Sequence, residues 1–129
     1  MLVIDTHVWV WWLTKPDRVG RAALRALEKA SRIGVPAICP WEVAMKSQAG
    51  KLRFDRSCEL WIEQALTEDP RLELFPLSPR ISVTAATLSW SHGDPADRMI
   101  VATARVHNAV LATADERIHD SRLVRCVWD

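Results

Sequence analysis

Short apolar runs alternate with longer amphipathic segments along this chain, and that alternation restricts the fold more than any other feature. Buried strands are predicted where apolar residues run together, at 2–4, 34–39, 72–77, 109–113 and 123–128. Apolar residues at helical spacing predict helices at 7–13, 20–32, 40–49, 58–68, 79–89 and 96–108. Strands that alternate with helices are typical of an α/β fold with a mainly parallel central sheet, here of about five strands. A length of 129 residues fits a single domain, 1–129.

The charge balance gives no overall sign of a nucleic-acid or membrane partner, because seventeen basic residues accompany sixteen acidic ones and the net charge is +1. A nucleic acid would have to bind a local basic rim, for which Lys15, Lys51 and Arg53 in predicted loops are candidates. Asp5 and His7 interrupt the apolar N-terminal stretch. We therefore expect no signal peptide, and no apolar run is long enough to span a bilayer.

The three cysteines, Cys39, Cys58 and Cys126, are far apart in the sequence and form no C-x-x-C pair. An odd number of such isolated cysteines argues against a disulfide framework and against a zinc site. We expect reduced thiols, mostly buried, in a soluble cytoplasmic protein.

Four acidic residues occupy equivalent places in the predicted elements. Asp5 and Asp115 come just after the first and fourth predicted strands. Glu42 and Asp97 lie in the first turns of predicted helices. Because the carboxyl ends of parallel strands meet at one edge of an open sheet, these four side chains are expected to converge there.

Convergent carboxylates repel one another, so a cluster of four needs a cation. Hard oxygen ligands select Mg²⁺ or Mn²⁺ over zinc, and such ions can activate a water molecule for attack on a phosphodiester. Each acid alone also has an ordinary explanation, since Asp and Glu favour helix first turns and Asp is common in turns. The joint arrangement is what favours a metal site.

Four segments of the chain resemble, in the same order, the motifs of PIN-domain ribonucleases of the VapC toxin type. The opening Val3–Leu13 resembles the family's first motif, and Pro40–Lys46, which contains Glu42, resembles its second acidic motif. Gly93–Ala104 resembles the third and Val110–Asp115 the fourth. The likeness covers nearly the whole chain, and the four motifs together are specific.

This resemblance implies a three-layer α/β/α sandwich, a Mg²⁺ or Mn²⁺ site and endoribonuclease activity. It implies a toxin neutralised by a cognate antitoxin, with RNA as substrate and a tendency to form homodimers. Asp5, Glu42 and Asp97 match the family's three main acids and Asp115 the fourth, which is the least constant. We expect Asp5 and Asp97 to bind the metal directly, Glu42 to bind it directly or through water, and Asp115 to complete the site.

The polar neighbours of these acids have both structural and functional interpretations. Thr6 fits an N-cap better than a ligand contact, and Asp94 fits a turn before Pro95. His7 and His92 are possible partners of the site or of the substrate. Lys46 lies one turn after Glu42, and we expect it to pair with Glu42 or to be solvated rather than to contact a phosphate. A structural role is favoured over RNA contact for Arg98.

Three tryptophans, Trp9, Trp11 and Trp12, fall within one short predicted helix and cannot share one face. Some are expected in the core, and others in a dimer or antitoxin surface. Stacking on RNA bases is a less favoured use.

Two functions of different classes fit the sequence: a toxin-type ribonuclease and a catalytically silent protein-interaction module on the same fold. The intact acidic set favours the enzyme, because a silent module has no reason to keep mutually repelling carboxylates. A metal phosphatase is disfavoured, since His7 stands where a D-x-D motif would place its second aspartate.

Overall fold

A computed structural model describes all 129 residues and has the predicted α/β architecture. Its central sheet has five strands in the order β3-β2-β1-β4-β5, and every neighbouring pair is parallel. The bounds are β1 (Leu2–Ile4), β2 (Ile33–Pro36), β3 (Leu72–Phe75), β4 (Val110–Ala112) and β5 (Cys126–Val127). Since β1 lies at the centre of the sheet, the residue that follows it lies between the ends of β2 and β4.

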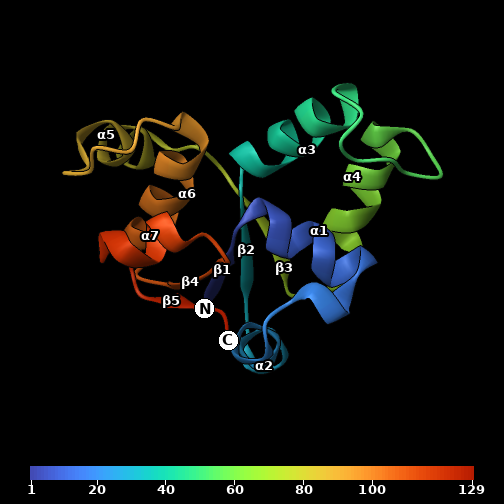
Figure 1. Cartoon of the computed structure of the whole chain (residues 1–129), viewed down its shortest axis with the longest axis horizontal. Helices are drawn as coiled ribbons and strands as arrows, with labels where there is room; N and C mark the ends of the chain where they lie inside the picture. Colours follow the sequence, from blue (N-terminus) through green and yellow to red (C-terminus); the bar gives the residue numbers. More distant parts are fainter.

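Helices cover both faces of the sheet and make the three layers. Figure 1 shows α1, α3 and α4 on one side and α5, α6 and α7 on the other, with α2 beyond the opposite end from α3. The helices are α1 (Thr6–Thr14), α2 (Arg21–Lys29), α3 (Ile38–Gln48), α4 (Cys58–Thr67), α5 (Pro79–Thr87), α6 (Pro95–Val106) and α7 (Glu116–Ser121); a 3-10 turn, η1, spans Pro16–Arg18. None of these helices combines the length and apolar character needed to cross a bilayer.

The second predicted strand was too long, because β2 ends at Pro36 and α3 begins at Ile38. Pro40 is the third residue of α3 and lies in its first turn, where its missing N–H has no intrahelical acceptor to lose. Glu42 therefore lies in the second turn of the helix, not the first. The apolar run misled the prediction because no polar residue separates the strand from α3, and Cys39 in the first turn of the helix is fully buried.

Two differences occur near the C-terminus. The fifth predicted strand, 123–128, shrinks to Cys126–Val127, because the left-handed Arg122 (φ 55°) turns the chain and only these two residues pair with β4. Helix α7 was not predicted. It has six residues and a single buried side chain, Ile118, which is too little for a periodic pattern.

The core lies on both faces of β1, whose three residues are all buried. Trp9 is fully buried and its ring lies 5.5 Å from that of Trp61. Trp11 and Trp12 are only partly buried, so the prediction that the three tryptophans diverge is confirmed. All cysteines are free, Cys39 buried and the other two half-buried.

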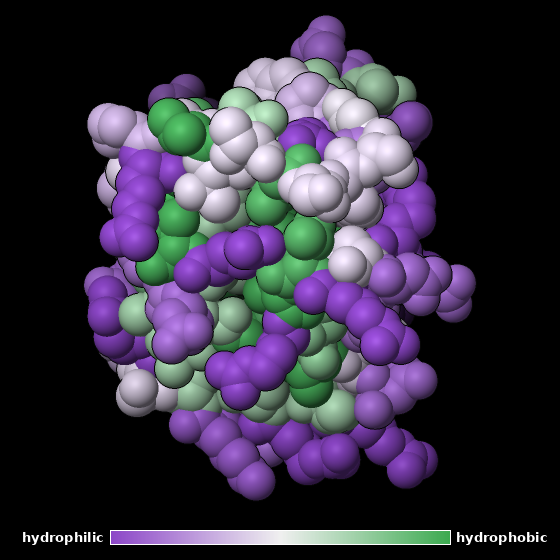
Figure 2. All heavy atoms as spheres, turned by 90° about the vertical axis from the view of Figure 1, so that its left-hand side faces the viewer, coloured by the Kyte–Doolittle hydropathy of each residue, from purple (hydrophilic) through white to green (hydrophobic).

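The outer side of α5, α6 and α7 exposes some apolar surface. Figure 2 shows apolar atoms in the middle of this face, interrupted by hydrophilic side chains. Val83 of α5 is the most exposed large apolar residue, at 63%. A homodimer stays a prediction.

Candidate active site

The site is built at the carboxyl ends of β1 and β4, where Asp5 and Thr113 leave neighbouring strands. The Thr113 hydroxyl donates to Asp5 Oδ2 at 2.6 Å and accepts the Asp115 N–H at 3.1 Å. Asp5 also caps α1, with its Oδ1 accepting the Thr6 N–H at 2.7 Å. Both Asp5 and Thr113 are buried. These bonds fix the Asp5 carboxylate and tie it to the segment that carries Asp115.

Thr6 links the first acid to Glu42. Its hydroxyl donates to Glu42 Oε1 at 2.5 Å, which joins the start of α1 to α3. The prediction that Thr6 is the N-cap was wrong. Asp5 has the extended backbone of a cap (φ −71°, ψ 161°), so its carboxylate caps the helix and leaves the Thr6 hydroxyl free for Glu42.

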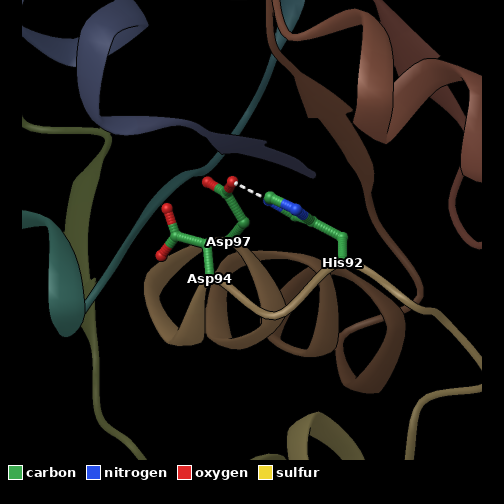
Figure 3. Close-up of side chains that lie close together, drawn as sticks. All are labelled: His92, Asp94 and Asp97. Atoms are coloured by element: carbon green, nitrogen blue, oxygen red, sulfur yellow. Dashed lines mark hydrogen bonds and ion pairs between the residues drawn. The ribbon is translucent and has the colours of Figure 1, made fainter.

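Asp97 projects from the first turn of α6, as predicted, and is 8% exposed. Its Oδ2 lies 2.7 Å from His92 Nε2. Figure 3 shows these two side chains pointing toward one another, with the Asp94 carboxylate beside them. One ligand atom from each of His92, Asp94 and Asp97 lies within 4.8 Å of the others. His92 is thus a direct partner of Asp97.

Asp94 has the turn role expected of it, because it caps α6 and its Oδ1 accepts the Ala96 N–H. Arg98 has a structural role, as predicted. Its guanidinium donates to four main-chain carbonyls, those of Ala85, Leu88, Trp90 and His92. These bonds anchor the segment between α5 and α6, which holds His92 in place.

Asp115 is the fourth of the predicted acids, and it is the N-cap of α7. Arg117 Nη2 lies 3.1 Å from Asp115 Oδ2 and 3.6 Å from Asp97 Oδ2, so one guanidinium bridges the two carboxylates. The Arg117 side chain is 62% exposed. An exposed cation therefore balances part of the negative charge.

His7 supports the cluster from α1. Its Nε2 accepts the Ala114 N–H at 3.0 Å, which requires an unprotonated nitrogen there. The proton of the neutral ring is then on Nδ1, 3.6 Å from Asp5 Oδ2. His7 therefore connects α1 to the segment after β4, and its Nδ1 lies near the Asp5 carboxylate.

The electrostatics agree with one shared cluster. Burial raises the pKa of Glu42, Asp5 adds to that rise, and the Thr6 hydrogen bond and Lys46 partly oppose it. Burial also raises the pKa of Asp97, with further contributions from Asp94, Asp5 and Asp115 against the opposing His92 bond.

The pKa of Asp115 behaves differently. Burial favours its neutral form, but the hydrogen bonds and charge of Arg117 outweigh this and lower the pKa. The four acids thus influence one another across four segments of the chain.

Thr113 and Arg117 belong to the site but were not predicted from the sequence. Thr113 had one available signal, since it directly follows β4, the strand beside the one that Asp5 follows. Arg117 had none, because a charged residue in an unpredicted helix is normally solvated. Lys46 is half-buried, and its charge opposes the raised pKa of Glu42.

Replacing Glu42 with Gln is expected to stabilise the protein at neutral pH without divalent ions, by up to about 1 kcal/mol. The raised pKa means that the folded protein binds this proton more tightly than the unfolded chain does. Stability therefore falls as the pH rises through that pKa. Gln removes the charge and keeps an oxygen that can accept the Thr6 hydroxyl. Denaturant unfolding in EDTA measures the difference.

The gain should disappear well below the usual Glu pKa of 4.5, where the wild-type carboxyl is protonated. Glu63→Gln on the exposed side of α4 is the matched control and should change little. A Glu42→Gln protein that is less stable than wild type at neutral pH would contradict a repulsive cluster.

Comparison with known proteins identifies the class first. The PIN domain family model matches residues 2–122, and the chain belongs to this family. Ribonuclease VapC22 of Mycobacterium tuberculosis (strain ATCC 25618 / H37Rv) is 35% identical over 130 residues, which cover 98% of each protein.

Solved structures agree with the fold. A chain of DNA-bound VapBC from Salmonella typhimurium matches with a TM-score of 0.72 and 16% identity, covering 98% of this chain and 96% of that one. A chain of VapBC2 from Rickettsia felis, bound to a DNA fragment from its promoter, matches with a TM-score of 0.69 and 18% identity, covering 99% and 98%. At these identities the likeness establishes the fold alone.

Proposed function

We propose that this chain is a metal-dependent endoribonuclease and the toxin of a toxin–antitoxin pair, with RNA as substrate and a cognate antitoxin as partner. The observation that carries the proposal is a network of hydrogen bonds and ion pairs among four separate segments of the chain. Each of these segments carries one of the four acids. Asp5 is bonded to Thr113, Thr113 to Asp115, and Thr6 to Glu42, while Arg117 bridges Asp115 and Asp97. Family membership and the VapC22 relative support the same activity.

The donor set fits a hard divalent cation. It consists of carboxylate oxygens, the ligands that Mg²⁺ and Mn²⁺ prefer. Two of the acids, Glu42 and Asp97, have a raised pKa because burial and neighbouring carboxylates disfavour their charge. The one exposed cation among them, Arg117, can withdraw toward solvent. We assign Asp5 and Asp97 as direct ligands, Glu42 as a direct or water-mediated ligand, and Asp115 as the fourth acid.

A divalent ion bound by these acids would polarise the phosphodiester and lower the pKa of an attacking water. The protein's own residues hold the metal-binding carboxylates in position. Thr113 and the capping role of Asp5 fix one carboxylate, His92 fixes another, and Thr6 holds Glu42. His7 and Arg98 hold the segments that carry these partners.

Metal removal tests the enzymatic part of the proposal. The purified chain should cleave end-labelled RNA with Mg²⁺ or Mn²⁺, lose the activity in EDTA and regain it when the ion is restored. Expression should arrest growth, and co-expression of the cognate antitoxin should relieve the arrest. Cleavage that persists in EDTA would reject the metal mechanism. Growth arrest without any cleavage would favour the silent interaction module.

A further inference from the structure

A groove lined by basic residues runs from the acidic cluster along α1. Two adjoining hollows of about 300 and 410 Å³ form it. They share a common wall, made of Val10, Trp11, Arg18, Lys51 and Leu52. The groove therefore lies between α1 and the segment that follows α3.

The charge of this groove differs from that of the whole chain. The two hollows are lined by five cationic residues and by no Asp or Glu: Lys15, Arg18, Lys46, Lys51 and Arg53. In a chain with seventeen basic and sixteen acidic residues, such a separation of charge is local. The groove is thus the local basic rim that a nucleic acid would need. It contains Lys15, Lys51 and Arg53, which were expected from the sequence, and also Arg18 and Lys46.

The inner end of the groove adjoins the acidic cluster. Thr6 and His7 line the smaller hollow. Thr6 donates to Glu42, and His7 Nδ1 lies 3.6 Å from Asp5 Oδ2. A chain lying in the groove would therefore reach the carboxylates directly.

The groove also presents a flat cation and an aromatic ring. The Arg18 guanidinium lies over Trp11, 4.8 Å from the ring centroid. Lys15, Arg18, Lys51 and Arg53 are exposed, so their charges are available to a ligand. Cations that follow a backbone, together with planar groups on which bases stack, are typical of single-strand binding sites. Double-stranded RNA, in contrast, is recognised across a wide minor groove and has no free base faces.

We propose that this groove binds single-stranded RNA next to the bond to be cleaved, with phosphates on Lys46, Lys51 and Arg18 and a base against the Arg18–Trp11 pair. The proposal rests on the nuclease function and adds where the substrate lies and why it is single-stranded. The cations lead a phosphodiester backbone toward acids that would otherwise repel it.

Binding can be measured separately from cleavage, with the whole protein in EDTA. The probe is a fluorescein-labelled single-stranded RNA of about twelve nucleotides, and the signal is its anisotropy. Arg18→Gln with Lys51→Gln removes two charges from the groove. Arg21→Gln with Arg25→Gln removes two exposed charges from α2, which does not line it, and serves as the matched control.

The groove variant is expected to bind about tenfold more weakly. Its slope of log affinity against log salt should be smaller by about 1.4, or 0.7 for each lost phosphate contact. The α2 variant should bind like wild type, and a duplex of the same sequence should bind more weakly than the single strand. Thermal melting establishes that both variants are folded.

Equal losses in the two variants, or equal binding of duplex and single strand, would overturn the proposal. So would a groove that binds polyglutamate but not RNA, which would assign it to an acidic protein segment. The nuclease proposal fails separately: RNA binding lost in the groove variant, without cleavage by the Mg²⁺-loaded wild type, would leave the groove in place and reject the enzyme. Cleavage by the wild type together with unchanged RNA binding by the groove variant would leave the enzyme in place and reject the groove.

Discussion

Asp5→Asn is expected to lower Mg²⁺-dependent RNA cleavage at least about a hundredfold while the protein stays folded. A metal ion at such a site contributes several kcal/mol to the transition state, and 1.36 kcal/mol corresponds to a factor of about ten in rate. Asn keeps an oxygen that can cap α1, so the bond to the Thr6 N–H can survive. What it loses is the negative charge that follows the central strand β1, together with the second oxygen that accepts the Thr113 hydroxyl.

The measurement is the cleavage rate of labelled RNA at saturating Mg²⁺. Asp17→Asn is the matched control, since Asp17 lies in η1, is exposed and stands outside the cluster. Its rate should equal that of wild type. An Asp5→Asn protein that retains most of the activity would remove Asp5 from the site.

Gly34→Val is expected to reduce the free energy of unfolding by about 3 kcal/mol or more. Gly34 lies in β2 beside β1, and a Cβ at this position would come 2.2 Å from Phe75 Cε2 and 2.6 Å from its Cδ2. The Phe75 ring has little room to move, because it is 4% exposed and stacks on His107 with centroids 4.2 Å apart. Valine would add two further methyl groups to that collision.

Urea unfolding measures the loss, and Gly93→Val is the matched control. No atom lies within 4 Å of a Cβ built on Gly93. The Gly93 variant should therefore stay within about 0.5 kcal/mol of wild type, as surface substitutions usually do. Equal stability of the Gly34 variant and wild type would mean that Phe75 has another place to pack.

The sequence was sufficient for the parallel α/β fold because buried strands and amphipathic helices differ in period. β1 and α6 illustrate this, since Leu2–Ile4 is fully buried and Pro95–Val106 has a strong apolar stripe. Where apolar residues follow one another without a break, their spacing does not show where a strand ends and a helix begins. The run from Gly34 to Cys39 contains both the end of β2 and the start of α3, and only tertiary packing separates them.

The places of the four acids relative to strands and helices imply a common edge of the sheet, and their role as metal ligands stays a prediction. Their partners could not be predicted. Thr113 and Arg117 act through contacts made after folding, with Asp5 across 108 residues in one case and with Asp97 in the other. Thr6 was assigned the wrong bond, because a cap and a bond to Glu42 are equally open to a threonine after an aspartate until the backbone of Asp5 is known.

Direct titration with Mn²⁺ tests most simply whether the carboxylates of separate segments share an ion. Electron paramagnetic resonance reports free Mn²⁺ in the presence of wild type, Asp5→Asn, Asp97→Asn and the control Asp17→Asn. Each of the two site variants should bind at least about tenfold more weakly than wild type, since removal of a direct or supporting contact costs a metal site about 10–100-fold in affinity. Wild-type affinity in both site variants would contradict the shared metal site.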